Sequence, residues 1–513
     1  MNYDEIFPKV VSHAKEYGYV FQSSEIYDGL GAVYDYGQLG AQLKRNIMEA
    51  WWKAMTQMHE NIVGLDSAIL MHPTIWKASG HVDAFNDPLI DNKDSKKRYR
   101  ADVLIEDQIA KYQAKSEKDT AKRAKKEGWE AGSEEYNGYL QNNRNAKKAQ
   151  ELQAQFEEAL NSDDLSRLRD IIVEQGIADP DTGSKEWSEV RQFNLMFKTQ
   201  LGATAEGAMD LYLRPETAQG IFVNFLNVQK TSRQKLPFGI AQIGKAFRNE
   251  IVARQFIFRM REFEQMEMQY FIKPGTQMEW FEYWKEARMN FHKALGLKPE
   301  NLQYHVHEKL AHYADAAEDI QFRFPFGFKE LEGIHSRTDF DLGQHQEFSG
   351  KKLQYFDPET QESYVPYVLE TSVGLDRTFL ANLCNAYLEE EVPNAKGGTD
   401  TRVVLKLHPM LAPYKAAILP IVKKDGLPEI AREIFDELKY DFPVMYEEKD
   451  TIGKRYRRQD AYGTPFCIAV DHDTKEDNAV TIRDRDTMEQ VRLPISEVAG
   501  YIRKQLSWKD LLG

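Results

Sequence analysis

The segment from Phe247 to Ile272, FRNEIVARQFIFRMREFEQMEMQYFI, alternates charged and apolar side chains, which is the pattern of strands with one buried face. Strand-like stretches lie on both sides of residues 252–254, so we expect two strands joined there. In the second stretch, the mostly polar face carries Ile257, Arg259, Arg261, Phe263, Gln265, Glu267 and Gln269. The opposite face, expected to be buried, carries Phe256, Phe258, Met260, Met266, Met268 and Tyr270.

The polar face of this segment has a composition suited to ligand binding. It combines two guanidiniums, an aromatic ring, an amide and a carboxylate, and Arg248 and Glu250 add a cation–anion pair at the end of the first strand. Such a surface suits a nucleotide with an anionic tail beside a second, cationic ligand. The alternative is an amphipathic surface hairpin with solvated charges. That alternative explains poorly why Phe263 lies among the charges.

Length and composition are those of a large enzyme. The 513 residues allow roughly two to four domains, each with a full core. No apolar run approaches the ~20 residues of a membrane span. The charged N-terminal segment lacks the apolar core of a signal peptide, so we expect a cytoplasmic protein that does not enter a membrane.

Cysteines and histidines give no clear metal or disulfide pattern. Cys384 and Cys467 are far apart, which argues against a disulfide framework or a cysteine zinc site. The pair His305 and His307 and the segment from His335 to His345 lack metal-ligand spacing, so structural roles are expected for them.

The formal net charge of −14, from 67 basic and 81 acidic residues, does not decide whether the partner is a nucleic acid. Net charge describes the whole chain, whereas phosphate contacts need only local patches. Basic runs occur at residues 93–100, 111–126 and 454–458. Each of them, taken alone, is more often a solvated face than a binding site.

Four regions differ in character along the chain. Residues 1–106 and 206–391 mix helices and strands and are expected to form one domain, which residues 107–205 interrupt with long polar helices. In this insertion one helix carries an apolar stripe, and a second helix follows an NSDD capping segment. The stripe consists of Leu152, Phe156 and Leu160, and the second helix contains Leu165, Leu168, Ile171 and Ile172. A linker is expected at Val392–Thr401, followed by an α/β domain over residues 400–513.

Three segments together resemble the signature motifs of the class II aminoacyl-tRNA synthetases. The segment Phe247–Ile272 is similar to motif 2, and Tyr364–Leu380, YVPYVLETSVGLDRTFL, is similar to the strand and helix of motif 3. The helix expected at Leu39–Met58, followed by the extended run SAILMHP that ends in Pro73, resembles motif 1, which forms the dimer in that class. The apolar positions of this helix are Leu39, Leu43, Ile47, Trp51, Ala54, Met55 and Met58.

Within the class, the resemblance narrows to the homodimeric glycyl-tRNA synthetase family and covers nearly the whole chain. Its segments, in order, include KASGHVDAFNDPLID, YRAD, LYLRPETAQGIF, FGFKELEGIHSRTDFDL, LHPMLAPYKAAILP and IGKRYRRQDAYGTPF. The chain departs from the family pattern at Phe328 and Lys329, where Trp and Gly are expected, and at His335. The implied fold is α/β overall: an α+β catalytic domain with an antiparallel sheet flanked by helices, a helical insertion, and a C-terminal α/β anticodon-binding domain.

The resemblance implies an enzyme, an aminoacyl-tRNA ligase for glycine, with ATP and Mg²⁺. By family position, the catalytic residues are Arg248, Arg377 and Glu250. The ATP contacts are Arg248, Asn249, Glu250, Phe258, Arg261, Phe263, Glu330, Leu331, Gly374 and Arg377. The glycine contacts are Arg100, Glu216, Phe263, Gln265, Glu267, Glu370 and Ser372. Glu330 and Glu370 are candidate magnesium ligands. Glu216 is also expected in the first turn of a helix, where its charge favours the helix dipole.

The implied reaction has two steps, and charge stabilisation and positioning dominate both of them. The glycine carboxylate attacks the α-phosphorus of ATP, and the 3′-terminal ribose of tRNA(Gly) then attacks the glycyl-adenylate. Arg248 would hold the α-phosphate, Arg377 the γ-phosphate, and Phe263 would stack on adenine. Tyr456 and Tyr462, in and beside the basic run 454–458, suit phosphates and bases of a tRNA loop. The alternatives are a prolyl or threonyl enzyme of the same class, or a non-catalytic relative such as a polymerase accessory dimer.

Overall fold

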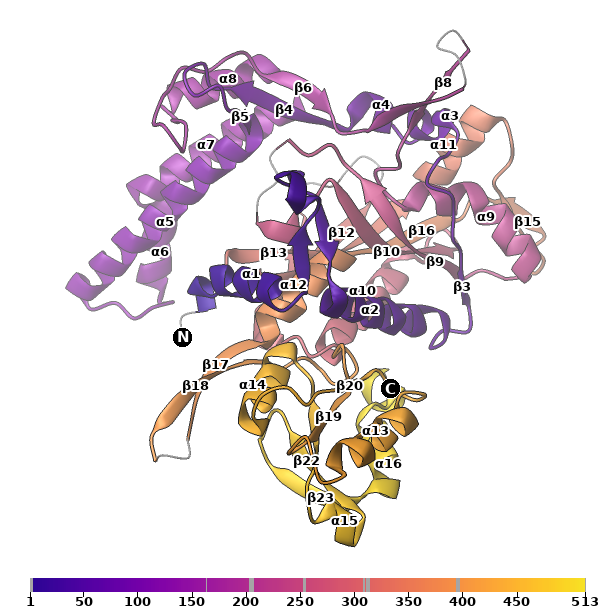
Figure 1. Cartoon of the computed structure of the whole chain (residues 1–513). Helices are drawn as coiled ribbons and strands as arrows, with labels where there is room; N and C mark the ends of the chain where they lie inside the picture. The colour runs from indigo at the N-terminus through magenta and orange to yellow at the C-terminus, as the bar shows by residue number, and fades with distance from the viewer. Residues whose placement is uncertain are drawn as a thin grey trace. The chain divides into compact units, whose positions relative to one another are not determined.

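The computed structural model describes residues 3–162, 164–202, 207–251, 255–307, 310, 314–393 and 397–512 (Figure 1). The chain divides into two compact units. Residues 1–79, 198–247 and 254–513 form the first unit, and residues 80–197 and 248–253 form the second. None of the helices in the described ranges combines the length and the apolar character that a membrane crossing requires.

A seven-stranded sheet is the centre of the first unit, with the strand order β11-β12-β13-β16-β10-β9-β3. Its strands are β3 (Ile62–Gly64), β9 (Phe238–Phe247), β10 (Glu262–Ile272), β11 (Leu302–Val306), β12 (Ala316–Phe324), β13 (Gly327–Thr338) and β16 (Tyr367–Gly374). All neighbouring pairs are antiparallel except β3 with β9. The class II antiparallel sheet expected from the sequence is confirmed.

One face of this sheet packs on helices and forms the main core. Met266, Met268 and Tyr270 of β10 are buried in it, as the alternation in the sequence predicts. The contributing helices are α1 (Phe7–Glu16), α2 (Gln38–Thr56), α10 (Gln277–Ala294) and α12 (Leu375–Ala386). A smaller cluster packs α9 (Ala218–Ser232) and α11 (Phe340–Ser349) against the ends of β9 and β10. The alternate side chains of β10 and β16 therefore form a separate, polar face.

Helix α2 buries most of the apolar stripe predicted for motif 1. Leu39, Leu43, Ile47, Trp51 and Met55 are buried. The helix ends at Thr56, so the predicted member Met58 lies beyond it and is 51% exposed. The strand that follows is β3 rather than the predicted run at 67–73, which contributes one isolated bridge, from Leu70 to Leu213.

The predicted alternation of motif 2 is wrong before Glu262. Residues Phe256–Phe258 form a 3-10 helix, and β10 begins only at Glu262. Ile257 and Phe258, which were predicted on opposite faces, are both buried. The physical reason is that this segment packs on helix α12 instead of pairing in the sheet, so alternation no longer sorts its side chains.

The second unit contains a small sheet and the helices of the insertion. The sheet has the order β5-β4-β6, with β4 (Asn86–Asp91), β5 (Arg98–Arg100) and β6 (Arg191–Asn194). The helices are α4 (His81–Ala84), α5 (Ala101–Glu127), α6 (Glu134–Asn142), α7 (Arg144–Asn161) and α8 (Leu165–Glu174).

The insertion helices confirm most of the predicted pattern. Leu152 and Phe156 of α7 are buried, whereas Leu160, predicted on the same stripe, is 44% exposed near the end of the helix. Leu168, Ile171 and Ile172 of α8 are buried with them. Asp164 caps α8 by accepting a hydrogen bond from the backbone N–H of Arg167 at 3.0 Å, as the NSDD segment predicts.

The C-terminal part of the first unit is an α/β domain. Its sheet has the order β20-β19-β21-β22-β23. The strands are β19 (Ala416–Pro420), β20 (Val444–Tyr446), β21 (Phe466–Val470), β22 (Ala479–Asp484) and β23 (Gln490–Pro494). The helices are α13 (Leu427–Leu438), α14 (Ile452–Tyr462), α15 (Thr474–Asp477), α16 (Ile495–Gln505) and α17 (Trp508–Leu512).

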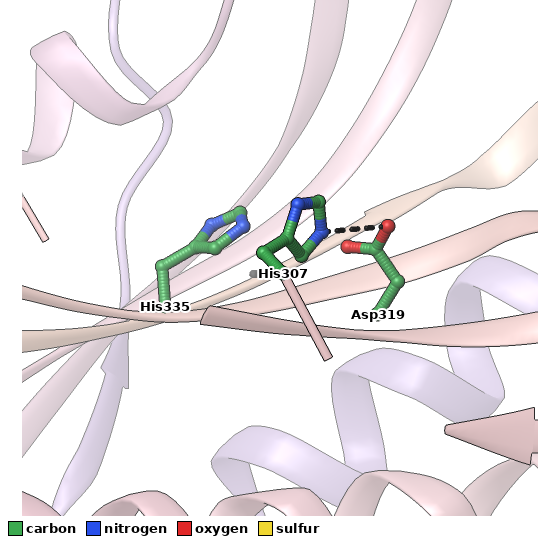
Figure 2. A group of neighbouring side chains, drawn as sticks. All are labelled: His307, Asp319 and His335. Atoms are coloured by element: carbon green, nitrogen blue, oxygen red, sulfur yellow. Dashed lines mark ion pairs between the residues drawn. The ribbon is translucent and has the colours of Figure 1, made fainter. Parts of the chain in front are cut away.

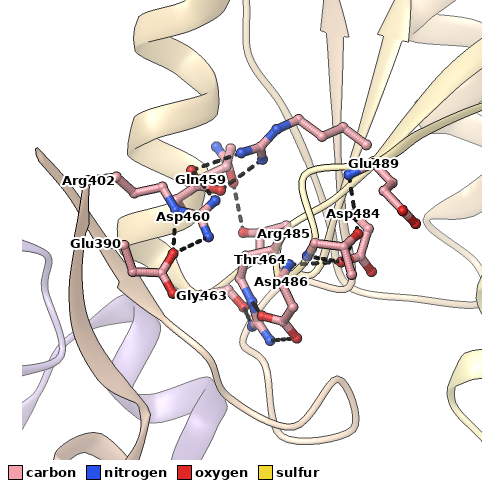
Figure 3. A network of polar contacts seen from close by, with 12 residues as sticks. Glu390, Arg402, Gln459, Asp460, Gly463, Thr464, Asp484, Arg485, Asp486 and Glu489 are labelled. Atoms are coloured by element: carbon pink, nitrogen blue, oxygen red, sulfur yellow. Dashed lines mark hydrogen bonds and ion pairs between the residues drawn. The ribbon is translucent and has the colours of Figure 1, made fainter. Parts of the chain in front are cut away.

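A hairpin stands where the linker Val392–Thr401 was predicted. It consists of β17 (Tyr387–Pro393) and β18 (Thr399–Leu405), and residues 394–396 lie outside the described ranges. Pro, Gly and Asn mark a hairpin turn as readily as a linker, which explains the difference. Figure 3 shows the polar network that ties this hairpin to the C-terminal domain: Arg402 contacts Glu390 at 2.8 Å and the buried Asp460 of α14 at 3.2 Å.

Shorter elements complete the described chain. They are η1 (Tyr3–Glu5), β1 (Val20–Gln22), η2 (Glu25–Tyr27), β2 (Tyr34–Tyr36), α3 (Pro73–Ala78), β7 (Lys198–Leu201), β8 (Met209–Tyr212), η3 (Phe256–Phe258), η4 (Pro299–Asn301), β14 (Tyr355–Asp357) and β15 (Glu362–Tyr364).

Candidate active site

Strand register brings four of the predicted glycine-binding residues together on the polar face of the large sheet. Gln265 of β10 lies opposite Gly374 of β16, and Glu267 lies opposite Ser372. Glu370 stands two residues farther along the same face of β16. Residues directly opposite each other in an antiparallel pair project to the same side of the sheet. Gln265 Nε2 lies 3.4 Å from Ser372 Oγ, a long contact.

Glu267 is a buried carboxyl that accepts hydrogen bonds from two neutral side chains. Thr217 donates its hydroxyl proton to Oε2 at 2.5 Å, and Gln269 Nε2 donates to Oε1 at 2.8 Å. Burial raises the pKa of Glu267 well above its usual range, and the negative charges of Glu370 and Glu216 raise it further. Glu267 therefore takes up a proton more readily than an ordinary glutamate does.

Glu370 is equally buried but ionised. Burial alone would raise its pKa, but Arg337 and His335 outweigh burial and hold the pKa below its usual range. Arg337 Nη1 lies 3.1 Å from Oε2, and His335 Nδ1 lies 2.8 Å from Oε1. Gln269 Nε2 donates to Oε2 at 2.7 Å and so connects Glu370 to Glu267. The pKa values of two neighbouring carboxyls are thus shifted in opposite directions.

Glu216 joins this group from the chain that leads into α9. Gln219 Nε2 donates to Glu216 Oε1 at 2.9 Å and to Asp341 Oδ1 at 3.1 Å. The helix begins at Ala218 with Thr217 as its N-cap, so Glu216 lies before the first turn and not inside it as predicted. We call Glu216, Glu267 and Glu370 the carboxylate cluster. The cluster is an acidic site suited to a cation.

Arg214 fixes the segment that carries Glu216 and Thr217. It is buried, and its guanidinium donates to the backbone oxygens of Lys245 at 2.6 Å and Ser67 at 3.0 Å. Gly244 makes this approach possible, because a Cβ there would lie 2.2 Å from Arg214 Nη2. Sequence reasoning did not assign Arg214 a role.

Arg337, Gln269 and Thr217 are further members of the site that were not predicted. Gln269 continues the alternation of Gln265 and Glu267, so its position on the polar face was visible in the sequence. Arg337 and Thr217 carry no such signal. Arg337 contacts Glu370, which lies 33 residues away in the chain, and Thr217 contacts Glu267, which lies 50 residues away.

The other end of the polar face carries the predicted phosphate-binding arginine. Gly374 is the N-cap of α12, and Arg377 lies in its first turn. The Arg377 guanidinium lies 4.4 Å from the centre of the Phe258 ring, and its Nη1 lies 3.0 Å from Glu330 Oε2. The side chain of Arg377 is 23% exposed and that of Glu330 is 51% exposed. We call Arg377, Glu330 and Phe258 the arginine end.

Three further residues predicted at the nucleotide have distinct environments. Arg261 Nη1 donates to the backbone oxygen of Gly31 at 3.0 Å. The ring of Phe263 is partly buried and packs against the main core. The side chain of Leu331 is buried in that core, so only its backbone is available to a nucleotide.

Glu330 and Glu370, the predicted magnesium ligands, lie far apart on the sheet. His335 of β13 is the residue opposite Glu370, and Glu330 lies five positions away on β13, about 16 Å at ~3.3 Å per residue. Glu370 is also engaged by Arg337 and His335. The exposed oxygens of Glu330 fit Mg²⁺, which keeps several waters and needs few protein ligands. Glu370 does not fit the same ion.

The second unit holds the remaining predicted site residues. Arg100 pairs with Asp102 at 2.6 Å and with Asp87 at 3.1 Å. The Arg248 guanidinium lies 5.3 Å from the centre of the Phe85 ring. The backbone N–H of Asn249 donates to the oxygen of Leu195 at 2.8 Å, and Glu250 is buried. This unit therefore gathers Arg100 and the segment 248–250.

Family models match three parts of the chain. Residues 197–386 match the tRNA synthetase class II core domain (G, H, P, S and T), and residues 415–505 match the anticodon binding domain. Residues 87–195 match glycyl-tRNA synthetase insertion domain 1. With the antiparallel sheet and its motif 2 and motif 3 strands, these matches define a class II aminoacyl-tRNA synthetase.

Comparison with curated relatives identifies the family within this class. The chain is 53% identical to a glycine–tRNA ligase of Chlorobaculum tepidum over 97% of this chain and 99% of the relative. It is 48% identical to one of Treponema denticola over 97% and 96%, and 50% identical to one of Staphylococcus haemolyticus over 97% and 98%. The chain belongs to the glycine–tRNA ligase family.

Solved structures support the fold. A prolyl-tRNA synthetase of Giardia lamblia, in complex with prolyl-adenylate, has a TM-score of 0.59 at 16% identity and covers 99% of this chain and 80% of that chain. One of Cryptosporidium parvum, complexed with halofuginone and AMPPNP, has a TM-score of 0.56 at 13% identity, with 98% and 76% covered. At these identities the likeness concerns the fold alone.

Proposed function

We propose that the chain activates glycine with ATP to glycyl-adenylate and transfers the glycyl group to the 3′-terminal ribose of tRNA(Gly). The observation that carries this proposal is the carboxylate cluster on the polar face, where Gln269 bridges the buried carboxyls of Glu267 and Glu370. An α-ammonium group is a cation whose size and charge suit such a site. Glycine has no side chain, so its charged ends must supply its affinity.

Glycine binding and the protonation of Glu267 are coupled in this proposal. A bound ammonium group would place a positive charge beside Glu267 and so lower the pKa of its carboxyl. Glu370 is ionised before the substrate arrives, because Arg337 and His335 already compensate its charge. Gln265, Ser372 and Arg100 are proposed to hold the remaining atoms of glycine.

The arginine end is proposed to bind the triphosphate of ATP. Arg377 is partly exposed, and its ion pair with Glu330 is of the kind that solvent weakens, so a γ-phosphate can replace the carboxylate. Arg248 would contact the α-phosphate, with Asn249 and Glu250 beside it, and Phe258, Arg261 and Phe263 would hold the nucleoside. Magnesium bound at Glu330 would offset phosphate charge.

The chemistry proposed for the site requires no side-chain nucleophile. The glycine carboxylate oxygen attacks the α-phosphorus and pyrophosphate leaves; the ribose hydroxyl of tRNA(Gly) then attacks the glycyl carbonyl carbon and AMP leaves. Side chains position the reactants and stabilise charge. The C-terminal domain is proposed to bind the anticodon, and the chain to act as a homodimer in the cytoplasm.

ATP–pyrophosphate exchange with each of the twenty amino acids in turn tests the proposal. Glycine alone is expected to support rapid exchange, and tRNA(Gly) to be charged with it. Exchange with proline or threonine would point to the other enzymes of the class, and no exchange with any amino acid would point to a non-catalytic relative. Sedimentation equilibrium tests the homodimer.

A further inference from the structure

Two histidines and an aspartate from three adjacent strands converge near one edge of the large sheet (Figure 2). His307 follows β11, Asp319 belongs to β12 and His335 belongs to β13. One ligand atom from each residue lies within 4.8 Å of the others. His307 Nε2 and Asp319 Oδ2 are 2.9 Å apart, which Figure 2 marks as an ion pair. We call these three residues the histidine–aspartate cluster.

Sheet register and two small residues create this convergence. Asp319 lies opposite Gly333, and His335 lies opposite Ala317, whose backbone oxygen accepts a hydrogen bond from the N–H of His307. A Cβ at Gly333 would lie 3.3 Å from His335 Nε2 and 3.6 Å from Asp319 Oδ1. The imidazole and the carboxylate therefore approach the same point above Gly333, and only glycine leaves that point open.

The remaining nitrogen of His335 is already occupied. Nδ1 lies 2.8 Å from Oε1 of the ionised Glu370 and is engaged by it. Nε2 lies on the side of Gly333 and is the nitrogen left for a metal ion, which would replace any proton there. Metal-binding histidines share this arrangement, in which a carboxylate accepts from one ring nitrogen while the other nitrogen binds the ion.

We propose that His307, Asp319 and His335 bind a divalent transition-metal ion, with zinc as the ion that fits the site. Two imidazole nitrogens and one carboxylate oxygen form a donor set typical of zinc sites with an open fourth position. Magnesium prefers oxygen ligands and is disfavoured here. A simple ion pair would require only His307 and Asp319, whereas the structure adds a third, preoriented donor.

The test is zinc binding by the full, untagged chain. After removal of metals by dialysis against a chelator, Zn²⁺ alone is titrated in competition with a chromophoric chelator, and metal content is measured by mass spectrometry. We expect one high-affinity zinc per chain and a rise in the thermal midpoint on zinc addition. Co²⁺ bound in place of zinc should give the absorption bands in the visible range that are typical of a cobalt ion with few ligands.

Variants decide whether the cluster is the site. Three single variants should each lower zinc affinity at least tenfold and remove the cobalt absorption: His307→Ala, Asp319→Asn and His335→Asn. Because His307 lies at the sheet edge, its variant is the least prone to misfold. The matched control is His472→Ala, which breaks a His–Asp pair of 3.2 Å in the C-terminal domain and should bind zinc normally. Three results would each overturn the proposal. They are unchanged zinc affinity in folded His307→Ala protein, no tight zinc binding by the wild-type chain, and displacement of zinc by Mg²⁺ at equal concentration.

Discussion

The carboxylate cluster and the arginine end lie on one sheet face but hold their charges differently. Glu267 and Glu370 are buried and bonded to neighbouring side chains through Gln269, Arg337 and His335. At the arginine end, Arg377 and Glu330 remain partly exposed in a single ion pair. Buried charges require fixed partners, whereas exposed pairs exchange partners at little cost. The carboxylate cluster is therefore preorganised for one small cation. At the arginine end, a phosphate can replace the carboxylate of Glu330 as the partner of Arg377.

Removing Arg337 should produce the largest effect on stability. Arg337→Met leaves Asp341 and Glu370 buried without their cation, and breaking a buried pair costs about 3–5 kcal/mol. The measurement is the free energy of unfolding in urea. The control Arg503→Met removes an exposed pair with Asp441 and should cost less than about 1 kcal/mol. Similar losses in both variants would contradict the contrast between buried and exposed charges.

Removing Arg377 should instead affect catalysis. Losing a preorganised phosphate contact costs on the order of 3 kcal/mol in the barrier, roughly a hundredfold in glycine-dependent ATP–pyrophosphate exchange. Because the Arg377–Glu330 pair is partly exposed, the urea midpoint of Arg377→Ala should change little. Glu330→Gln is the companion variant, since it removes the resting partner and keeps the arginine. Normal exchange by folded Arg377→Ala protein would remove Arg377 from the mechanism.

Glu267→Gln should weaken glycine binding and leave ATP binding intact. A hydrogen bond to a charged group contributes about 1.5–3 kcal/mol, so the glycine KM should rise roughly ten- to a hundredfold. Because the folded protein raises the pKa of Glu267 and a bound ammonium lowers it, the glycine affinity of the wild-type chain should depend more on pH than that of the variant, which calorimetry over a pH series measures. Lost ATP binding with unchanged glycine binding would place the ammonium site elsewhere.

The same variant makes a pH prediction. Because the folded protein holds the Glu267 proton above the usual pKa of 4.5, the unfolded state binds fewer protons in that range, and stability falls as pH rises from about 4.5 to the folded pKa. Glu267→Gln lacks this loss, so its unfolding free energy relative to wild type should increase with pH across that window. Parallel stability profiles for the two proteins would show that Glu267 titrates normally.

The smallest effect is expected in the basic run of α14. Arg455 is buried and donates to the backbone oxygen of Pro420, and Arg458 pairs with Asp450 and Glu447. The run is therefore not a uniform phosphate-binding surface. Lys454→Ala with Arg457→Ala should raise the KM for tRNA(Gly) a few-fold and lower the salt slope by about one per lost phosphate contact. ATP–pyrophosphate exchange without tRNA should be unchanged in this double variant. Lys423→Ala serves as the control. An equal rise in the KM for tRNA(Gly) in that control would show that the effect is not specific to the basic run.

Several features of the fold could be predicted from local pattern. The alternation of Met266, Met268 and Tyr270, the periodicity of α2 and the capping residue Asp164 each depend on neighbours within one element. Errors occurred where a local pattern has two outcomes. Residues Phe256–Phe258 alternate like part of a strand but form a 3-10 helix that packs on α12, and strands β17 and β18 pair on the two sides of the expected linker.

The sequence alone determined the family, the antiparallel sheet and the polar face of β10, because motifs and alternation are local and survive any arrangement of the rest. Only the tertiary structure decided which side chains share an environment. Arg337 reaches Glu370, Thr217 reaches Glu267, and His307 meets Asp319 and His335, through strand pairings between distant segments. The raised pKa of Glu267 is likewise a result of burial beside other carboxylates. Such contacts depend on register, which spacing along the chain does not encode.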